Sequence, residues 1–257
     1  MADYLGGGEL KSFTRRVLLG HSLSHFKKDI KYLGLPGRTM WFEEQLAQIG
    51  DSIEIQMDGY EWDGEVVEVQ QARVALSNIP INLHQGNIHD APGRYNLAWF
   101  DYCGCLDPEK IHALSEFIRH GLYFNGQDDP VIAITLLRGR EKRSVWDLIP
   151  YKEAPPSIRA TAPSGHRAIH TQWQLLRRQL FPELLSQAAG DIGARFVVDR
   201  YIEYHETSPM VLLIGRVSRD LRENPLNFEI EKLGDRNVPE REDRQPAAVN
   251  PAAQAPA

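Results

Sequence analysis

Apolar and polar positions follow one another along the chain in a repeated order of strand and helix. Residues 29–35 form a short apolar run and residues 51–61 alternate between apolar and polar side chains, so both predict β-strands. Each run is followed by apolar residues at helical spacing, over 40–50 and over 64–76. The second of these helices has its predicted buried face at Val66, Val69, Val74 and Leu76. Two strand-helix units therefore open the predicted fold.

The middle of the chain continues the alternation with more apolar strands. Residues 79–87 predict a third strand, and residues 96–102 predict a fourth whose continuous apolar character suits burial on both faces. A helix follows, with Asp107 at the N-cap position and Pro108 at its first helical position. Its apolar stripe contains Ile111, Leu114, Phe117 and Ile118. A strand covered on both faces indicates a parallel sheet.

The last part of the pattern changes from crossover helices to a hairpin. Residues 130–139 predict a fifth strand, and an amphipathic helical pattern runs over about 166–189. Residues 194–217 then hold two strand-like runs that are separated only by the short link HETSP. Such a link is too short for a crossover helix, so these two strands are predicted to be antiparallel.

Composition places this pattern in one globular domain with a tail. The chain has 257 residues, of which 42% are hydrophobic and 25% charged, as in ordinary globular proteins. We expect an N-terminal helical extension over 1–28, an α/β domain over 29–220, and a polar, disordered tail over 221–257, where Pro, Ala and charge dominate. No apolar run approaches the roughly 20 residues of a membrane span, and the first residues lack a signal-peptide pattern. A cytoplasmic protein without a membrane partner is expected.

Five alternating units closed by a hairpin resemble the sheet of the class I S-adenosylmethionine-dependent methyltransferases, over residues 29–217. In that family the last strand inserts antiparallel beside its neighbour. The resemblance implies an α/β fold with a Rossmann-like, doubly wound, mostly parallel seven-stranded sheet, an antiparallel C-terminal hairpin and helices on both faces. It also implies S-adenosylmethionine as the cofactor and methyl transfer as the activity of a divergent member.

The ends of the first two strands carry residues that suit this cofactor. In open α/β sheets the ligand lies at the carboxyl ends of the strands, where the strand order reverses. Gly34, Pro36 and Gly37 form a loop whose glycines permit close approach of a ligand, although the glycine-rich run of the family is longer. Glu61 resembles the acidic residue that accepts hydrogen bonds from both ribose hydroxyls, and Asp63 is the alternative.

The next two strand ends carry the remaining candidates. Asn87 and Asp90 follow the third strand and resemble the position that often holds the adenine amino group. Asp101 and Tyr102 end the fourth strand, where the family places the residues nearest the reacting methyl group. We expect Asp101 to accept a proton or a hydrogen bond from the acceptor, and Tyr102 to stack on a flat base.

Each candidate also has a purely structural interpretation. Gly34 and Gly37 can belong to an ordinary turn, and Glu61 and Asp63 to a solvated loop or a helix cap. The stretch DYCGC can simply end a buried strand, with Cys103 packed as a small apolar residue.

Two other kinds of site are disfavoured. A zinc site needs about four ligands, and the chain has two cysteines without a spaced Cys/His cluster. His21 and His25 share a helical face but have no acidic partner in sequence, so they predict an ordinary N-terminal helix and no metal. Attack by Cys103 on a pyrimidine ring, as in methylation of cytosine C5, is also disfavoured. Enzymes with that chemistry usually have a Pro-Cys pair at this turn, whereas Tyr102 precedes Cys103 here.

Basic residues after the fifth strand indicate nucleic acid as the acceptor. The group consists of Arg138, Arg140, Lys142 and Arg143. These side chains follow the same edge of the sheet as the predicted cofactor and suit phosphates. Arg177 and Arg178 are interpreted as a solvated helix face, and the net charge of -6 argues against a large nucleic-acid footprint. A protein or small-molecule acceptor, a degenerate methyltransferase-like binding protein and an adaptor that uses its tail remain alternatives.

Overall fold

One twisted sheet organises the part of the chain that the structure describes. The computed structural model describes residues 9–49, 53–102, 104–126, 128–138, 174–205, 208–223, 226 and 228–233. Within these residues the sheet has eight strands in the order β3-β2-β1-β4-β5-β7-β6-β8. Their bounds are β1 (Asp29–Gly34), β2 (Glu54–Glu61), β3 (Ile81–Gln85), β4 (Leu97–Asp101), β5 (Val131–Leu137), β6 (Arg195–His205), β7 (Pro209–Ser218) and β8 (Ile230–Leu233).

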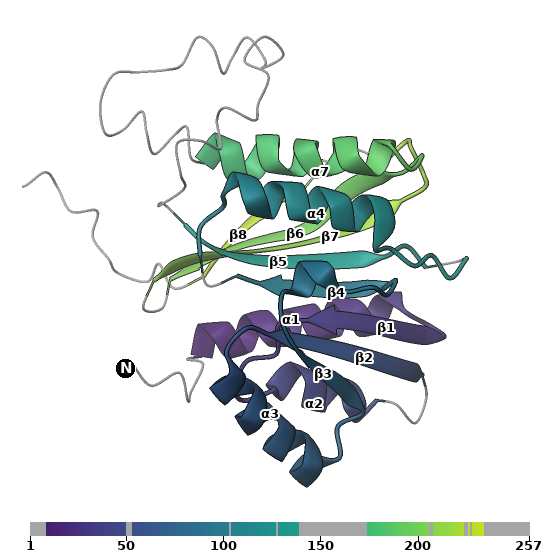
Figure 1. Cartoon of the computed structure of the whole chain (residues 1–257). Helices are drawn as coiled ribbons and strands as arrows, with labels where there is room; N and C mark the ends of the chain where they lie inside the picture. Colours follow the sequence, from purple (N-terminus) through teal and green to yellow (C-terminus); the bar gives the residue numbers. More distant parts are fainter. Residues whose placement is uncertain are drawn as a thin grey trace, which may run out of the picture.

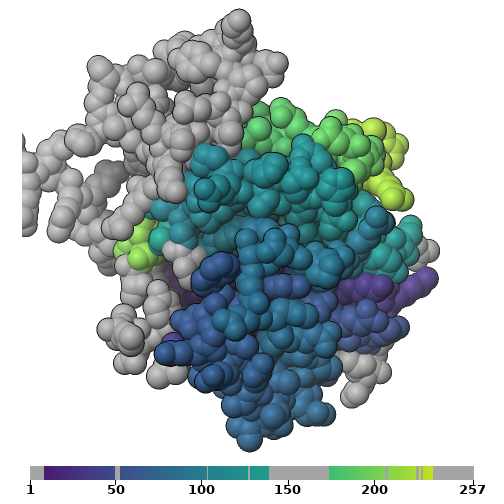
Figure 2. Space-filling view, in the orientation of Figure 1, coloured from purple at the N-terminus to yellow at the C-terminus, as the bar shows by residue number. Residues whose placement is uncertain are grey.

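Helices cover both faces of the sheet, as predicted. Figure 1 shows α4 (Pro108–His120) and α7 (Phe181–Gly190) side by side over one face, and α1 (Glu9–His25) behind the other face. Two further helices, α2 (Trp41–Ala47) and α3 (Gly64–Ser77), follow β1 and β2. In the space-filling view the teal atoms of α4 and the green atoms of α7 form one continuous surface (Figure 2). A layer of sheet between two layers of helices confirms the doubly wound α/β architecture.

The strand directions also confirm the predicted terminal hairpin. Strands β3, β2, β1, β4 and β5 are parallel, whereas β7 lies antiparallel between β5 and β6. Leu137 at the end of β5 is opposite Met210 at the start of β7. The carboxyl ends of the parallel strands, the start of β7 and the end of β6 therefore meet at one edge.

The sheet has an eighth strand, where the sequence predicts seven. Strand β8 comes from the segment expected to be a polar tail, and it pairs in parallel with β6. It is only four residues long and half charged, so it shows no strand pattern of its own. A two-pronged ion pair between Arg200 and Glu231, with distances of 2.8 and 2.7 Å, joins it to β6. Pairing with an existing strand, and not local propensity, makes β8 a strand.

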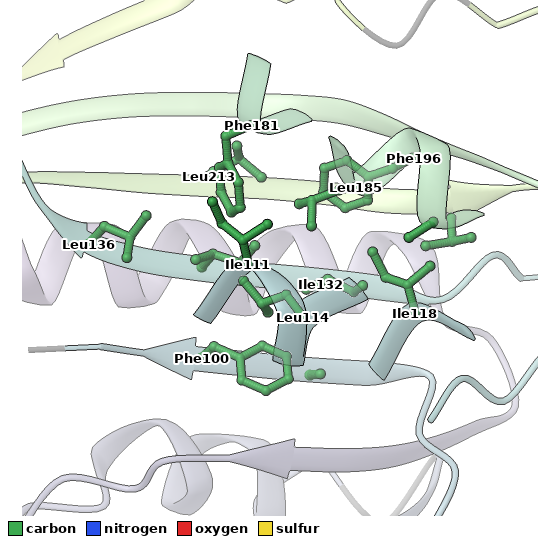
Figure 3. Close-up of a cluster of buried hydrophobic side chains, with 14 of the residues drawn as sticks. Phe100, Ile111, Leu114, Ile118, Ile132, Leu136, Phe181, Leu185, Phe196 and Leu213 are labelled. Atoms are coloured by element: carbon green, nitrogen blue, oxygen red, sulfur yellow. The ribbon is translucent and has the colours of Figure 1, made fainter. Parts of the chain in front are cut away.

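Two apolar clusters fill the space between the sheet and its helices. Figure 3 shows the first, where Phe100, Ile132 and Leu213 of the strands meet side chains of α4 and α7. The second lies on the other face and joins Leu18 of α1 and Phe42 of α2 to Trp99 of β4. Burial of each such large side chain contributes about 1.5–3 kcal/mol. The buried strands β4 and β5 lie between the two clusters, which explains their continuous apolar sequence.

Helix α4 matches its prediction, whereas the buried face of α3 does not. Asp107 caps α4 by accepting a hydrogen bond from the backbone N–H of Lys110 at 2.9 Å. In α3, Val69 and Leu76 are 48% and 87% exposed, so they are wrongly placed on the predicted buried face, although Val74 of that face packs against the core. The face that packs inward carries Val67 and Gln70. Gln70 is polar but buried because its amide donates to the Pro36 carbonyl, and an apolar count misses such a residue.

Candidate functional site

The strand order reverses between β1 and β4, and the predicted site residues converge there. Strand β1 pairs with β2 on one side and with β4 on the other. Gly34, Glu61 and Asp101 therefore stand at the carboxyl ends of three adjacent strands. Ligands of open α/β sheets bind at this kind of reversal. The edge formed by β2, β1 and β4 is the candidate site.

Tyr32 occupies the space beside Gly34. A Cβ atom added to Gly34 would lie 1.9 Å from the Tyr32 hydroxyl oxygen. That hydroxyl donates a hydrogen bond of 2.8 Å to the carboxylate Oε1 of Glu43 in α2, and both side chains are buried. Burial is the main cause that raises the pKa of Glu43 and of Tyr32. The absent side chain at position 34 thus makes room for a buried Tyr32–Glu43 pair.

The rest of the loop after β1 divides into a packed and an open part. Pro36 is buried, and a Cβ atom on Gly59 of β2 would come within 2.9 Å of its ring. Gly37 is exposed, and the atom nearest to its Cβ position is Nη2 of Arg15, 3.8 Å away. Pro36 therefore fixes the loop against the sheet, and Gly37 is the position in the loop where a ligand can approach the backbone.

Asp101 joins the buried pair and two cations of α1 in one cluster. Lys11 Nζ lies 3.7 Å from Asp101 Oδ2, and 13% of the Asp101 side chain is exposed. The charges of Asp101 and Arg15 both act on Tyr32 and Glu43. We call Lys11, Arg15, Tyr32, Glu43 and Asp101 the switch-point cluster. Four of its members were not predicted, and the available signal was Glu43, an acidic residue between the apolar Phe42 and Leu46 of a helix.

Tyr102 lies on the opposite face from this cluster, so the predicted stacking role needs correction. Its side chain is 8% exposed and its hydroxyl lies 2.9 Å from Nε2 of His89. Lys110 Nζ lies over the ring at 5.6 Å from the centroid. Burial lowers the pKa of His89 and raises that of Tyr102. Tyr102 and His89 are therefore hydrogen-bonded to each other, and the buried Tyr102 ring is not open for a base to stack on it.

The carboxylates at the ends of β2 and β3 make different local contacts. Oε1 of Glu61 accepts the backbone N–H of Asp63 at 3.1 Å, and Asp63 in turn caps α3 by accepting from Glu65 at 2.9 Å. Asn87 caps the 3₁₀ turn η1 (Ile88–Asp90). The helix-cap interpretation thus holds for Asp63, and the capping role of Asn87 was not predicted. Asp90, the last residue of η1, is exposed.

The basic residues are arranged differently from the prediction. Arg138 does not stand free, because its Nη1 lies 2.6 Å from Oε2 of Glu203 in β6. Arg178 Nη2 lies 2.6 Å from Oε1 of the same carboxylate, and Arg177 is 1% exposed, so a solvated face at these two arginines is wrong. Arg140, Lys142 and Arg143 lie outside the described residues.

The turn after β4 is part of the same edge. The Gly104 carbonyl accepts the backbone N–H of Leu137 at 3.0 Å, which ties this turn to the end of β5. Cys105 is partly buried, and Cys103 lies outside the described residues. Among the residues that the structure describes, no group of three or more His, Cys, Asp or Glu side chains can hold a metal ion. His21 does have an acidic partner, Asp199, at 3.4 Å.

No helix in the described ranges is both long and apolar enough to cross a membrane.

Comparison with known proteins finds similar structures at low sequence identity. Trm5b from Pyrococcus abyssi is 12% identical, with a TM-score of 0.49 over 83% of this chain and 50% of its own. A putative sarcosine dimethylglycine methyltransferase from Galdieria sulphuraria is 13% identical, with a TM-score of 0.49 over 82% of this chain and 88% of its own. A putative rRNA methylase from Clostridium thermocellum is 12% identical, with a TM-score of 0.48 over 83% of this chain and 100% of its own. This chain thus spans half the length of Trm5b.

No protein family and no curated protein matches the sequence. Because the structural neighbours have low sequence identities and low TM-scores, we assign the fold from the strand order of this chain. Because the order reverses between β1 and β4, and β7 runs antiparallel between β5 and β6, the chain has a Rossmann-like, doubly wound α/β fold with an antiparallel C-terminal hairpin.

Proposed function

We propose that the protein is an S-adenosylmethionine-dependent methyltransferase whose acceptor is a nucleic acid base. The observation that carries this proposal is the reversal of strand order between β1 and β4, which gathers Gly37, Glu61 and Asp101 along one edge. This edge combines an open glycine, a carboxylate suited to hydroxyl groups and a second carboxylate for the acceptor.

The residues at this edge fit the cofactor. Among the described residues, the Glu61 carboxylate accepts one hydrogen bond, through Oε1, and Oε2 is left to accept from a ribose hydroxyl. Asn87 and Asp90 lie beside it, because the backbone N–H of Gly86 bonds to the Glu61 carbonyl at 3.0 Å. We therefore assign Glu61, Asn87, Asp90 and Gly37 to cofactor binding. We assign Gly34, Pro36 and Asp63 a structural role, in which they hold the loops that carry these residues.

The chemistry requires little covalent machinery from the protein. When bound, S-adenosylmethionine would supply the methyl group of its sulfonium to an acceptor nitrogen or oxygen, which would lose a proton in exchange. The proposed work of the chain is to align the acceptor and to remove its proton. Asp101 accepts that proton, since its carboxylate is partly exposed at the reversal point, and Lys11 balances its charge. Tyr102 positions the η1 loop through His89.

The basic residues that follow β5 in the sequence support nucleic acid as the acceptor. Arg138 lies at the carboxyl edge of the sheet, and Arg140, Lys142 and Arg143 follow it in the sequence. Such a concentration of positive charge suits a phosphate backbone.

A second candidate is a binding protein with the same fold that has lost turnover. One observation favours it, namely that Tyr32 fills the space beside Gly34 at the centre of the cofactor loop.

Calorimetry with S-adenosylmethionine separates the two candidates. We expect the Glu61→Ala variant to bind the cofactor about 10–100-fold more weakly, because a charge-assisted hydrogen bond is lost. Glu54→Ala is the matched control, since Glu54 is exposed at the other end of β2. Asp101→Asn should bind the cofactor normally but lose transfer of a labelled methyl group to RNA or DNA. Absence of cofactor binding by the wild-type protein at millimolar concentration would refute the enzyme and favour the binding protein.

A further inference from the structure

We propose that Arg138 and Arg178, held by the buried carboxylate of Glu203, form a subsite for a phosphate group of the acceptor. This inference rests on the proposed function, because it assigns the subsite to the substrate that Asp101 serves. Its ligand class is a nucleotide phosphate, either on a free nucleotide or within a strand. The subsite includes Arg178 and Glu203, which the basic run after β5 does not contain.

Geometry places two guanidinium groups on opposite sides of one carboxylate. Arg138 Nη1 lies 2.6 Å from Oε2 of Glu203, and Arg178 Nη2 lies 2.6 Å from Oε1. Arg178 Nε also bonds to Oε1, at 3.1 Å. Glu203 is 3% exposed, so the carboxylate acts as a fixed internal anchor. The fixed carboxylate holds both guanidinium groups in one orientation. Guanidinium groups held in this way are suited to donate paired hydrogen bonds to a phosphate.

Charge is left over after this pairing. Two guanidinium groups face one carboxylate, and the two arginine side chains remain 24% and 21% exposed, whereas Glu203 is covered. Arg138 Nη1 donates a hydrogen bond of 2.6 Å to Oε2 of Glu203, and a guanidinium group has five N–H donors in all. Positive charge therefore faces outward from a buried negative anchor, and an anion is the ligand that such a surface attracts.

Arg178 lies in an irregular turn of its helix. Residues Leu176–Leu180 form a π-helical turn, in which the backbone N–H of Phe181 bonds to the carbonyl of Leu176. Single π turns inside helices are uncommon and concentrate at functional sites. The turn brings both Arg177 and Arg178 toward the sheet, although neighbours in a helix normally diverge.

The subsite lies on the same edge as the proposed site of transfer. Thr135 of β5 is opposite Asp101 of β4, and Arg138 follows three residues later along the same chain. At the rise of an extended chain this spacing corresponds to about 10 Å. The backbone N–H of Arg138 also bonds to the carbonyl of Pro209 at 2.8 Å, which fixes the position of this residue. Arg138 and Asp101 therefore lie at the same carboxyl edge of two adjacent strands.

Binding of phosphate to the whole chain tests the inference. Calorimetry with inorganic phosphate, adenosine 5′-monophosphate, adenosine and a single-stranded RNA decamer should show that the mononucleotide and the decamer bind and that inorganic phosphate competes with both. Arg138→Gln and Arg178→Gln should each weaken phosphate binding about 10–100-fold. Arg200→Gln is the matched control, because Arg200 forms a similar two-pronged pair with Glu231 on the same sheet. Glu203→Gln should tighten phosphate binding, since the internal anion is neutralised.

The outcomes distinguish this inference from the proposed function. Equal phosphate affinity of the wild type, Arg138→Gln and Arg178→Gln overturns the subsite, even if the cofactor binds. Loss of phosphate binding in these variants, in a protein that never binds S-adenosylmethionine, leaves the subsite and removes the methyltransferase. Should Arg178→Gln unfold, Arg138→Gln and Arg138→Lys decide the question, because Arg138 lies at the exposed end of β5. A stronger effect on the decamer than on the mononucleotide assigns the phosphate to a strand, and the reverse assigns it to a free nucleotide.

Discussion

The missing side chain at position 34 decides how the buried Tyr32 packs. In sequence, Gly34 and Gly37 look equivalent, since both belong to one short loop after the first strand. In the structure Tyr32 lies over Gly34, whereas the space at Gly37 is open. Sequence reasoning correctly places both glycines at the carboxyl edge, but only packing assigns them different roles.

Alanine substitutions separate these roles. Gly34→Ala forces the buried Tyr32 away from Glu43, so we expect the free energy of unfolding to fall by about 1–3 kcal/mol. Gly37→Ala is the matched control and should change it by less than about 0.5 kcal/mol, because nothing lies closer than 3.8 Å to the new methyl group. Urea denaturation measures both. Equal stability of the two variants would show that Tyr32 does not pack against Gly34.

The buried Glu43 should make stability depend on pH with a definite sign. Burial raises its pKa in the folded chain, so the folded state favours the protonated form. The stabilising contribution is complete below the pKa of the unfolded chain and is lost as pH rises through the folded pKa. Glu43→Gln remains neutral and can still accept from Tyr32. We expect its free energy of unfolding, relative to wild type, to increase from pH 4 to pH 7 in urea titrations.

Glu44, the next residue, is the control of opposite sign. Two hydrogen bonds from Arg73 lower the pKa of Glu44. Its contribution is therefore present above the pKa of the unfolded chain and is lost as pH falls through the folded pKa. Glu44→Gln should be less stable than wild type at pH 7, by up to about 1 kcal/mol, and equal to it in acid. A Glu43→Gln protein that loses stability at pH 7 would contradict the account of Glu43.

At the scale of elements, the sequence predicts helices and strands best where the contacts that stabilise them lie within one short segment. The N-cap and apolar stripe of α4 and the alternation of β2 are properties of short segments, and both were predicted. The buried face of α3 was not, because Gln70 is stabilised there by the distant Pro36 carbonyl. The interpretation of Arg177 and Arg178 as a solvated face failed for the same reason, since Glu203 lies in another element.

Asp63 resembles a ligand of the cofactor in sequence but serves as the N-cap of a helix in the structure. Its carboxylate caps α3, so Asp63→Ala should lower the free energy of unfolding by about 1 kcal/mol. Asp63→Asn should change it by only a few tenths, because asparagine caps equally well. We expect both variants to bind S-adenosylmethionine like wild type in calorimetry, in contrast to Glu61→Ala. Weak cofactor binding by Asp63→Asn, in a protein of normal stability, would instead make Asp63 a ligand.

At the scale of the whole molecule, the candidate site depends on which strands are neighbours. Gly34, Glu61 and Asp101 are far apart in the chain, and the order β2-β1-β4 brings them to one edge. The same order brings α1 over that edge, where Lys11 meets Asp101. The predicted N-terminal extension therefore contributes to the candidate site, a role that its own sequence does not indicate.

The sequence by itself determined the alternation of strands and helices, the terminal hairpin and the set of residues at the strand ends, because hydrophobic periodicity, caps and link length act over a few neighbouring residues. Only the tertiary structure decided the eighth strand, the inward turn of Tyr102, the burial of Glu43 and the pairing of Arg138 and Arg178 on Glu203. Those features depend on groups that are distant in the chain, and burial and pairing energies arise only once the sheet has brought such groups together.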